Sequence, residues 1–129
     1  MLTNPKIEKI GQNIKYDWMV LRRHGADLAG VDFDTMIASF LLDPGSRQHN
    51  LDALALVHLN LRKIPTSDII GKGKDEITMD QVPVETVSEY ACEDADAVVR
   101  LWPHLRRRVA DVGAAELFAD AELIAPSVA

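Results

Sequence analysis

The longest helical pattern in this chain contains the stretch Tyr90-Ala91-Cys92-Glu93-Asp94-Ala95-Asp96. Around it, apolar residues recur every three or four positions, at Val84, Val87, Ala91, Ala95, Val98, Trp102, Leu105 and Val109. This spacing predicts a helix over residues 83–109 with one buried stripe, since Pro83 suits the first turn of a helix. Tyr90 and Asp94 share one face of that helix, and Asp94 lies at the edge of the stripe. Such a carboxylate is either solvated at the rim or compensated by a hydrogen bond or a metal ion.

A second stretch, Gly11-Gln12-Asn13-Ile14-Lys15-Tyr16-Asp17, follows the apolar residues Ile7 and Ile10. It is typical of a strand that ends and turns into a helix. Asn13 suits the N-cap of that helix, because its side-chain oxygen can accept a hydrogen bond from a free backbone N–H in the first turn. Capping and a role in a catalytic site are compatible for this residue.

Periodicity and turn signals also assign the other elements. We expect a strand over 6–12, a short strand before Asp34, and helices over 14–24, 35–42 and 51–59, the last capped by Asn50. Pro103 should kink the long helix. His58 lies in an apolar helix and is interpreted as a packed core histidine. The four histidines show no metal-ligand spacing.

The composition indicates one globular domain, with 129 residues of which 47% are hydrophobic. A net charge of −6 argues against capture of nucleic acid by phosphate contacts alone, although bound divalent ions would invert the local charge. Cys92 is the only cysteine, so no internal disulfide can form; we expect it to pack rather than react, and we expect a cytoplasmic location. No apolar run reaches the roughly 20 residues of a membrane span, so no membrane partner is expected.

The two stretches together resemble the 3′→5′ proofreading exonuclease domain of family-A DNA polymerases, a member of the DnaQ-like, ribonuclease H-like exonucleases. The family's second motif, Asn-x-x-x-Asp, matches Asn13 and Asp17, and its third motif, Tyr-x-x-x-Asp, matches Tyr90 and Asp94. Further strings follow in the family's order and at close to its separations: Phe33-Asp34-Thr35-Met36, Leu51-Asp52-Ala53-Leu54-Ala55 and Ile70-Gly71-Lys72-Gly73-Lys74. Each string alone is a weak signal, whereas the ordered set is specific.

The resemblance implies an α/β protein with the ribonuclease H-like exonuclease fold, N-terminally truncated and mostly helical with two or three short strands. It implies hydrolysis of single-stranded DNA 3′ ends by two divalent ions, Mg²⁺ or Mn²⁺, which prefer carboxylate oxygens. Asp17 and Asp94 match the family's metal ligands, and Tyr90 matches the tyrosine that orients the attacking water. These three are the expected catalytic residues. The residues expected near the bound DNA are Gln12, Asn13 and, one position from the family's phosphate-contacting arginine, Arg47.

The family's first motif, an Asp-x-Glu on the first strand of the sheet, would fall upstream of residue 1. Asp120-Ala121-Glu122 has the same form but lies in residues 113–129, which resemble the junction to the polymerase domain, so we expect no substitute there. Residues 1–112 are therefore expected to form a partial exonuclease domain that binds metal weakly and cleaves slowly or not at all. The alternative is a catalytically inactive remnant that serves as a structural or nucleic-acid-binding module. Missing strands would leave a sheet edge unpaired, which favours association with a second copy.

Overall fold

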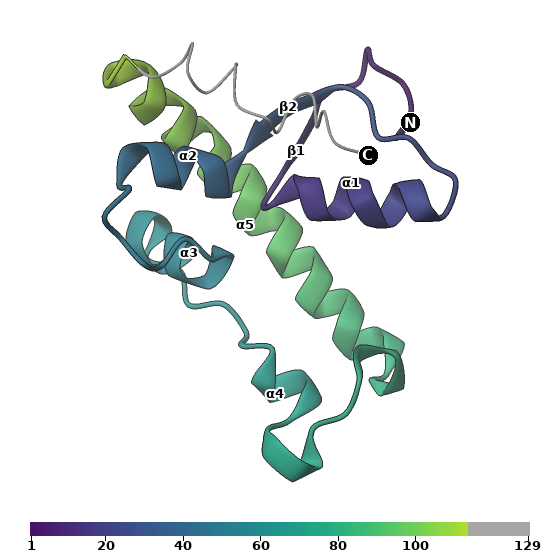
Figure 1. Cartoon of the computed structure of the whole chain (residues 1–129). Helices are drawn as coiled ribbons and strands as arrows, with labels where there is room; N and C mark the ends of the chain where they lie inside the picture. The colour runs from purple at the N-terminus through teal and green to yellow at the C-terminus, as the bar shows by residue number, and fades with distance from the viewer. Residues whose placement is uncertain (114–129) are drawn as a thin grey trace.

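The computed structural model describes residues 1–113, and its longest element is the helix α5 (Val84–Asp111), against which α2 (Thr35–Leu42), α3 (Leu51–Leu59) and β1 (Lys9–Gly11) pack (Figure 1). The elements in chain order are β1 (Lys9–Gly11), α1 (Ile14–Arg23), β2 (Val31–Asp34), α2 (Thr35–Leu42), α3 (Leu51–Leu59), α4 (Ser67–Ile70), two 3₁₀ turns (Gly73–Asp75 and Met79–Gln81) and α5 (Val84–Asp111). The predicted mostly helical α/β class, with short strands, is confirmed. The tail predicted from residue 113 onward lies outside the described residues, apart from Gly113, and stays a prediction.

β1 and β2 form a parallel two-stranded sheet, and α1 with the loop after it makes the crossover that a parallel pair requires. Ile10 pairs with Phe33 and Gly11 with Asp34, so both strands end at the same edge of the sheet. α1 and α2 begin directly at that edge. The carboxyl ends of parallel strands are where α/β proteins place ligand sites, and this edge is therefore the place to look for one.

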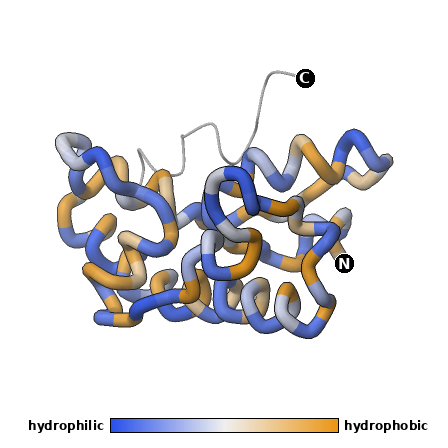
Figure 2. Tube along the Cα trace, turned by 90° about the horizontal axis from the view of Figure 1, so that it is seen from below, coloured by the Kyte–Doolittle hydropathy of each residue, from blue (hydrophilic) through white to orange (hydrophobic). Residues whose placement is uncertain are grey.

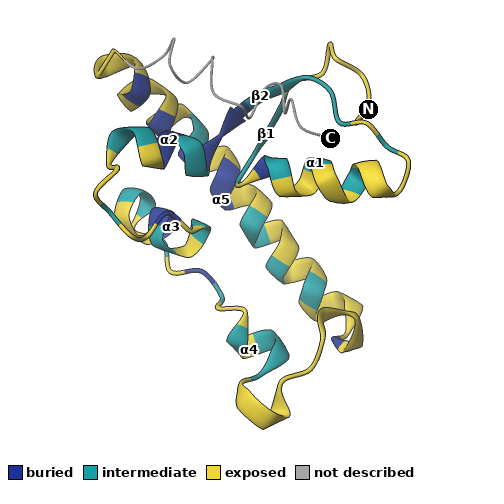
Figure 3. Cartoon of the chain, in the orientation of Figure 1, coloured by how far each residue is buried: buried dark blue, intermediate teal, exposed yellow. Residues whose placement is uncertain are grey.

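α5 is buried along its C-terminal half and largely exposed along its N-terminal half (Figure 3). Its buried residues are Ala97, Val98, Leu101, Leu105 and Val109. The prediction of one buried stripe along the whole helix is wrong for the first half, where Val84 is 78% exposed and Ala91 and Ala95 are exposed. The reason is that the core contributed by α1, β2, α2 and α3 meets α5 in its second half. Pro103 does not end the helix.

The shorter helices follow the local signals closely. α2 and α3 have the predicted bounds, and the Asn50 side chain caps α3 by accepting from the Ala53 N–H at 2.8 Å. α1 is mostly uncovered, since Met19 and Val20 are exposed and only Ile14 is buried. Cys92 is exposed rather than packed. Hydrophobic stretches along the trace are short and interrupted (Figure 2), and within residues 1–113 no helix has the length and apolarity needed to span a bilayer.

Candidate active site

A groove of about 620 Å³ lies between the end of β1, α1 and α5. The residues that line this α1–α5 groove are Ile10, Gly11, Gln12, Asp17, Leu51, Ala91, Asp94, Ala95, Val98 and Val99. Asp17 and Asp94, which are far apart in the sequence, therefore line one cavity beside the carboxyl end of β1. Their role as metal ligands stays a prediction, but the fold brings them to one place.

The surroundings of Asp17 in the groove shift its pKa. The pKa of its carboxyl group is raised above the ordinary 3.8, first by partial removal from water and second by the negative charge of Asp34. Much of Asp17 nevertheless remains accessible to solvent, so that a cation can reach the carboxylate. A carboxylate whose ionised form is disfavoured in this way is stabilised by a bound cation.

Asp34, at the end of β2, is fully buried and holds the first turns of two helices. Its Oδ1 accepts from the N–H groups of Asn13 (3.0 Å) and Met36 (2.8 Å), and its Oδ2 accepts from the N–H of Ile14 (2.8 Å). Such N–H groups have no partner within their own helix, and the helix dipole favours a negative charge there. Asp34 thus fixes the end of β1 against the end of β2. The sequence prediction missed this role, although an aspartate directly before the helix at Thr35 is an N-cap signal.

Gln12 and Asn13, both predicted to lie near DNA, differ in their surroundings. Gln12 lines the groove, but its Nε2 donates to the His49 carbonyl oxygen at 2.7 Å and its Oε1 accepts from the Thr35 hydroxyl. Asn13 is exposed and has a left-handed backbone with φ 55°. The prediction that its side chain caps α1 is wrong, because a capping residue is normally extended and Asp34 already accepts these N–H groups.

Arg47 lies in the loop between α2 and α3, is exposed, and is not among the residues that line the groove. The loop residue that is held inside the fold is His49, which is 6% exposed. Its Nε2 donates to the Ser46 carbonyl oxygen at 2.9 Å, and its Nδ1 lies 2.6 Å from the Ser39 hydroxyl. His49 anchors the loop, and its own carbonyl oxygen holds the Gln12 side chain.

His58, predicted to be a packed core histidine, is only half-buried, and His49 is the buried histidine instead. The Nδ1 of His58 lies 3.2 Å from the Nε2 of His104, so the pair links α3 to α5. Partial burial, then the charges of His104 and Arg108, lower the pKa of His58 below the ordinary 6.5. The misassignment arose because apolar neighbours in the sequence do not say which face of a helix is covered.

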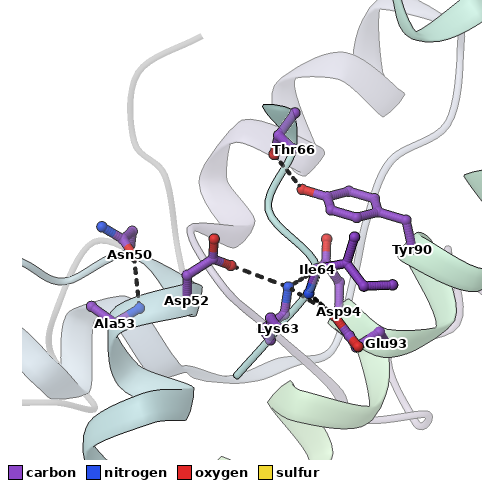
Figure 4. Close-up of polar contacts among 9 residues, drawn as sticks. All are labelled: Asn50, Asp52, Ala53, Lys63, Ile64, Thr66, Tyr90, Glu93 and Asp94. Atoms are coloured by element: carbon purple, nitrogen blue, oxygen red, sulfur yellow. Dashed lines mark hydrogen bonds and ion pairs between the residues drawn. The ribbon is translucent and has the colours of Figure 1, made fainter. Parts of the chain in front are cut away.

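Tyr90 and Asp94 both face the α3–α4 linker, residues 60–66 (Figure 4). The Tyr90 hydroxyl lies 2.7 Å from the Thr66 hydroxyl, and the Ile64 N–H donates to the Glu93 carboxylate at 2.6 Å. Asp94 forms a hydrogen-bonded ion pair with Lys63. The sequence left open whether the Asp94 carboxylate is solvated or its charge is compensated by a partner. In the structure its charge is compensated, and the compensating group is the Lys63 ammonium.

Lys63 is a functional candidate that the sequence prediction missed. Its side chain has no exposed surface, and its Nζ also bonds to Asp52 at 3.2 Å and lies 3.9 Å from the Glu93 carboxylate. Burial would lower the pKa of Lys63, but the bonds to Asp94 and Asp52 outweigh it and hold the pKa above the ordinary 10.5. No sequence pattern signals this cluster, because its members come from three separate segments.

The oxygen donors of Asp17 and Asp94 fit a hard divalent ion such as Mg²⁺ or Mn²⁺ in kind. They do not fit it in number, because residues 1–113 contain no group of three His, Cys, Asp or Glu side chains placed to hold a metal ion. Asp94 is also already paired with Lys63. Asp17 and Asp94 alone therefore do not complete a metal site within the described residues.

Comparison with known proteins assigns the chain to a family. The family described as 3′-5′ exonuclease matches residues 1–110. This chain belongs to the 3′-5′ exonuclease family. Similar proteins are the DNA polymerase I of Rhizobium leguminosarum, 37% identical over 92% of this chain, and that of Pseudomonas aeruginosa, 40% identical over 84%. The chain spans 12% of the length of each of these relatives. The resemblance to the exonuclease domain of family-A DNA polymerases is therefore confirmed.

The fold is supported by a solved structure, the POL domain of Pol1 from M. smegmatis in complex with a DNA primer-template and dNTP. The two chains superpose with a TM-score of 0.74 over 95% of this chain and 18% of that chain, at 24% sequence identity. The predicted ribonuclease H-like exonuclease fold agrees with this superposition and with the family match.

Proposed function

We propose that this chain is the exonuclease part of a DNA polymerase I-like protein, and that its α1–α5 groove hydrolyses the terminal phosphodiester bond at single-stranded DNA 3′ ends. The observation that carries the proposal is the convergence of Asp17 and Asp94 on one groove beside the carboxyl end of β1. The family match over residues 1–110 supports the reaction class. Hydrolysis of a phosphodiester needs an activated water and relief of charge on the phosphate, and divalent ions held by carboxylates would supply both.

In this proposal Asp17 and Asp94 would hold Mg²⁺ or Mn²⁺, and such ions would supply an activated water and neutralise charge on the phosphate. The Tyr90 phenol is positioned by its bond to the Thr66 hydroxyl and orients the attacking water. Asn13 offers an exposed side chain close to the end of β1, where the DNA end would lie. Gln12 serves through its fixed position in the groove wall rather than through a free amide.

Arg47 is the weakest member of the proposed DNA contacts, because it is exposed in a loop and does not line the groove. Its guanidinium can contact a DNA phosphate some distance from the reacting bond. With a net charge of −6, the chain needs bound metal ions or a neighbouring basic surface to hold DNA.

A second candidate function is a catalytically inactive structural or nucleic-acid-binding module. It is favoured by the pairing of Asp94 with Lys63 and by the lack, within residues 1–113, of a third ligand for the metal. In the described residues the sheet has only two strands, so each strand has one edge that no other described strand pairs. Association of two copies along such an edge is part of either proposal, and sedimentation as a clean monomer would exclude it.

The test is degradation of a 5′-labelled single-stranded oligonucleotide in Mg²⁺ or Mn²⁺ by wild type, Asp17→Ala and Asp94→Ala. The matched control is Asp96→Ala, because Asp96 is an exposed carboxylate on the same helix that pairs with Arg100 at 2.9 Å. We expect shortening from the 3′ end that Asp17→Ala and Asp94→Ala abolish and that Asp96→Ala leaves unchanged. Cleavage that survives Asp94→Ala would overturn the proposed site, and DNA binding without any cleavage would favour the inactive module.

A further inference from the structure

Lys63 is surrounded by carboxylates and is paired with Asp94, one of the two proposed metal ligands. Its ammonium group bonds to Asp94 and Asp52 and approaches the Glu93 carboxylate, and its side chain has no exposed surface (Figure 4). The Tyr90 ring also lies beside it, with Nζ 5.3 Å from the ring centroid. A positive charge is thus held against both residues of the third motif.

The α3–α4 linker holds Lys63 in place by contacts on either side. Before it, the Leu61 N–H donates to the Ala55 carbonyl oxygen at 3.1 Å. After it, the Ile64 N–H bonds to Glu93 and Thr66 bonds to the Tyr90 hydroxyl. The linker therefore runs along the face of α5 that carries the third motif, and moving Lys63 would disturb the contact of Tyr90 as well.

We propose that Lys63 is a built-in competitor of the divalent metal ion, so that a metal ion binds Asp94 only after the lysine ammonium has left it. This inference rests on the proposed role of Asp94 as a metal ligand. An ammonium group bonded to Asp94 repels a divalent ion that approaches the same carboxylate, since both are cations that would lie within a few ångströms of each other.

The experiment compares Mn²⁺ affinities of the 129-residue chain, measured by the electron paramagnetic resonance signal of free Mn²⁺. The Lys63→Met variant should bind Mn²⁺ on the order of tenfold more tightly than wild type, because it removes one adjacent positive charge. Arg62→Met is the matched control, since it removes the same charge from the exposed neighbouring residue and should leave the affinity within about twofold. Adding Asp94→Asn to Lys63→Met should abolish the gain.

The outcomes separate this inference from the proposed function. Equal affinity of wild type and Lys63→Met, with binding lost in Asp94→Asn, would overturn the competition while leaving Asp94 as a metal ligand. Binding unaffected by Asp94→Asn would overturn both. Absence of Mn²⁺ binding in wild type and Lys63→Met alike would also overturn the competition, because the lysine would not be what keeps the metal away.

A second measurement uses wild type alone, in case Lys63→Met does not fold by circular dichroism. The Lys63 ammonium should give an observable nitrogen–proton NMR signal, because burial and bonding to carboxylates slow its exchange with water. Titration with diamagnetic Mg²⁺ should shift this signal or broaden it through faster exchange. A Lys63 signal that stays unchanged while Asp94 responds to Mg²⁺ would overturn the competition.

Discussion

Replacing Asp34 with alanine should destabilise the protein by about 3 kcal/mol, because one buried carboxylate holds the first turns of both α1 and α2. Loss of a helix cap costs about 1 kcal/mol, and two helices are affected here. The bonded N–H groups would remain without a partner in a buried place, which adds about 1 kcal/mol or more. A loss of this size is a large part of the roughly 5–15 kcal/mol that stabilises an ordinary domain. Urea unfolding followed by far-UV circular dichroism measures it.

Two further variants make the Asp34 prediction specific. Asp34→Asn keeps an acceptor for Asn13 and Met36 but loses the bond from Ile14, so we expect an intermediate loss of about 1–2 kcal/mol. Asp27→Ala, in the exposed loop before β2, is the control and should change stability by less than about 0.5 kcal/mol. The reasoning would be refuted if Asp34→Ala lost no more stability than Asp27→Ala.

Three other predictions concern charge and backbone. The folded chain raises the pKa of Asp17 above 3.8, so the free energy of unfolding should fall as pH rises from 3.8 through the raised pKa. Urea titrations at several pH values should show that Asp17→Asn removes this fall. An unchanged pH profile in the variant would contradict the prediction. Gly30→Ala should lower the free energy of unfolding by more than about 1 kcal/mol, because φ of Gly30 is +79° and the added Cβ would lie 2.5 Å from the Ile7 carbonyl oxygen. Thermal melting tests this, and an unaltered Tm would show that the close approach is not fixed. The lowered pKa of His58 means that the unfolded chain takes up a proton more readily as pH falls through 6.5. Stability should therefore drop there, and His58→Asn should reduce the drop measured by denaturation at pH 7 and pH 5.

The parts of the fold that follow from nearby residues could be predicted from the sequence. The bounds of α2 and α3 and the Asn50 cap depend on signals within one helical turn. The Asp17 and Asp94 pair was found through motif order, and the structure places both on one groove. Such local signals do not predict which face of a helix is covered by other elements, and the exposed first half of α5 is an example.

The parts of the site that were missed depend on contacts between distant segments. Lys63 lies 31 residues from Asp94 and 11 from Asp52, and no spacing rule joins a residue in an extended linker to carboxylates on two helices. Asp34 lies 20 residues from Ile14, so a local signal marks it as the cap of α2 but not of α1. The wrong assignment of Asn13 as a cap follows directly, because Asp34 occupies the N–H groups that Asn13 was expected to satisfy.

The most direct test of the α1–α5 groove as the metal-dependent site is paramagnetic broadening of backbone NMR signals by substoichiometric Mn²⁺. We expect the signals of residues 11–17 and 91–98 to broaden first, because these segments carry Asp17 and Asp94, and we expect Asp17→Asn to weaken the effect at both. Uniform broadening, or broadening that begins at other acidic residues and ignores Asp17→Asn, would contradict the assignment of the groove.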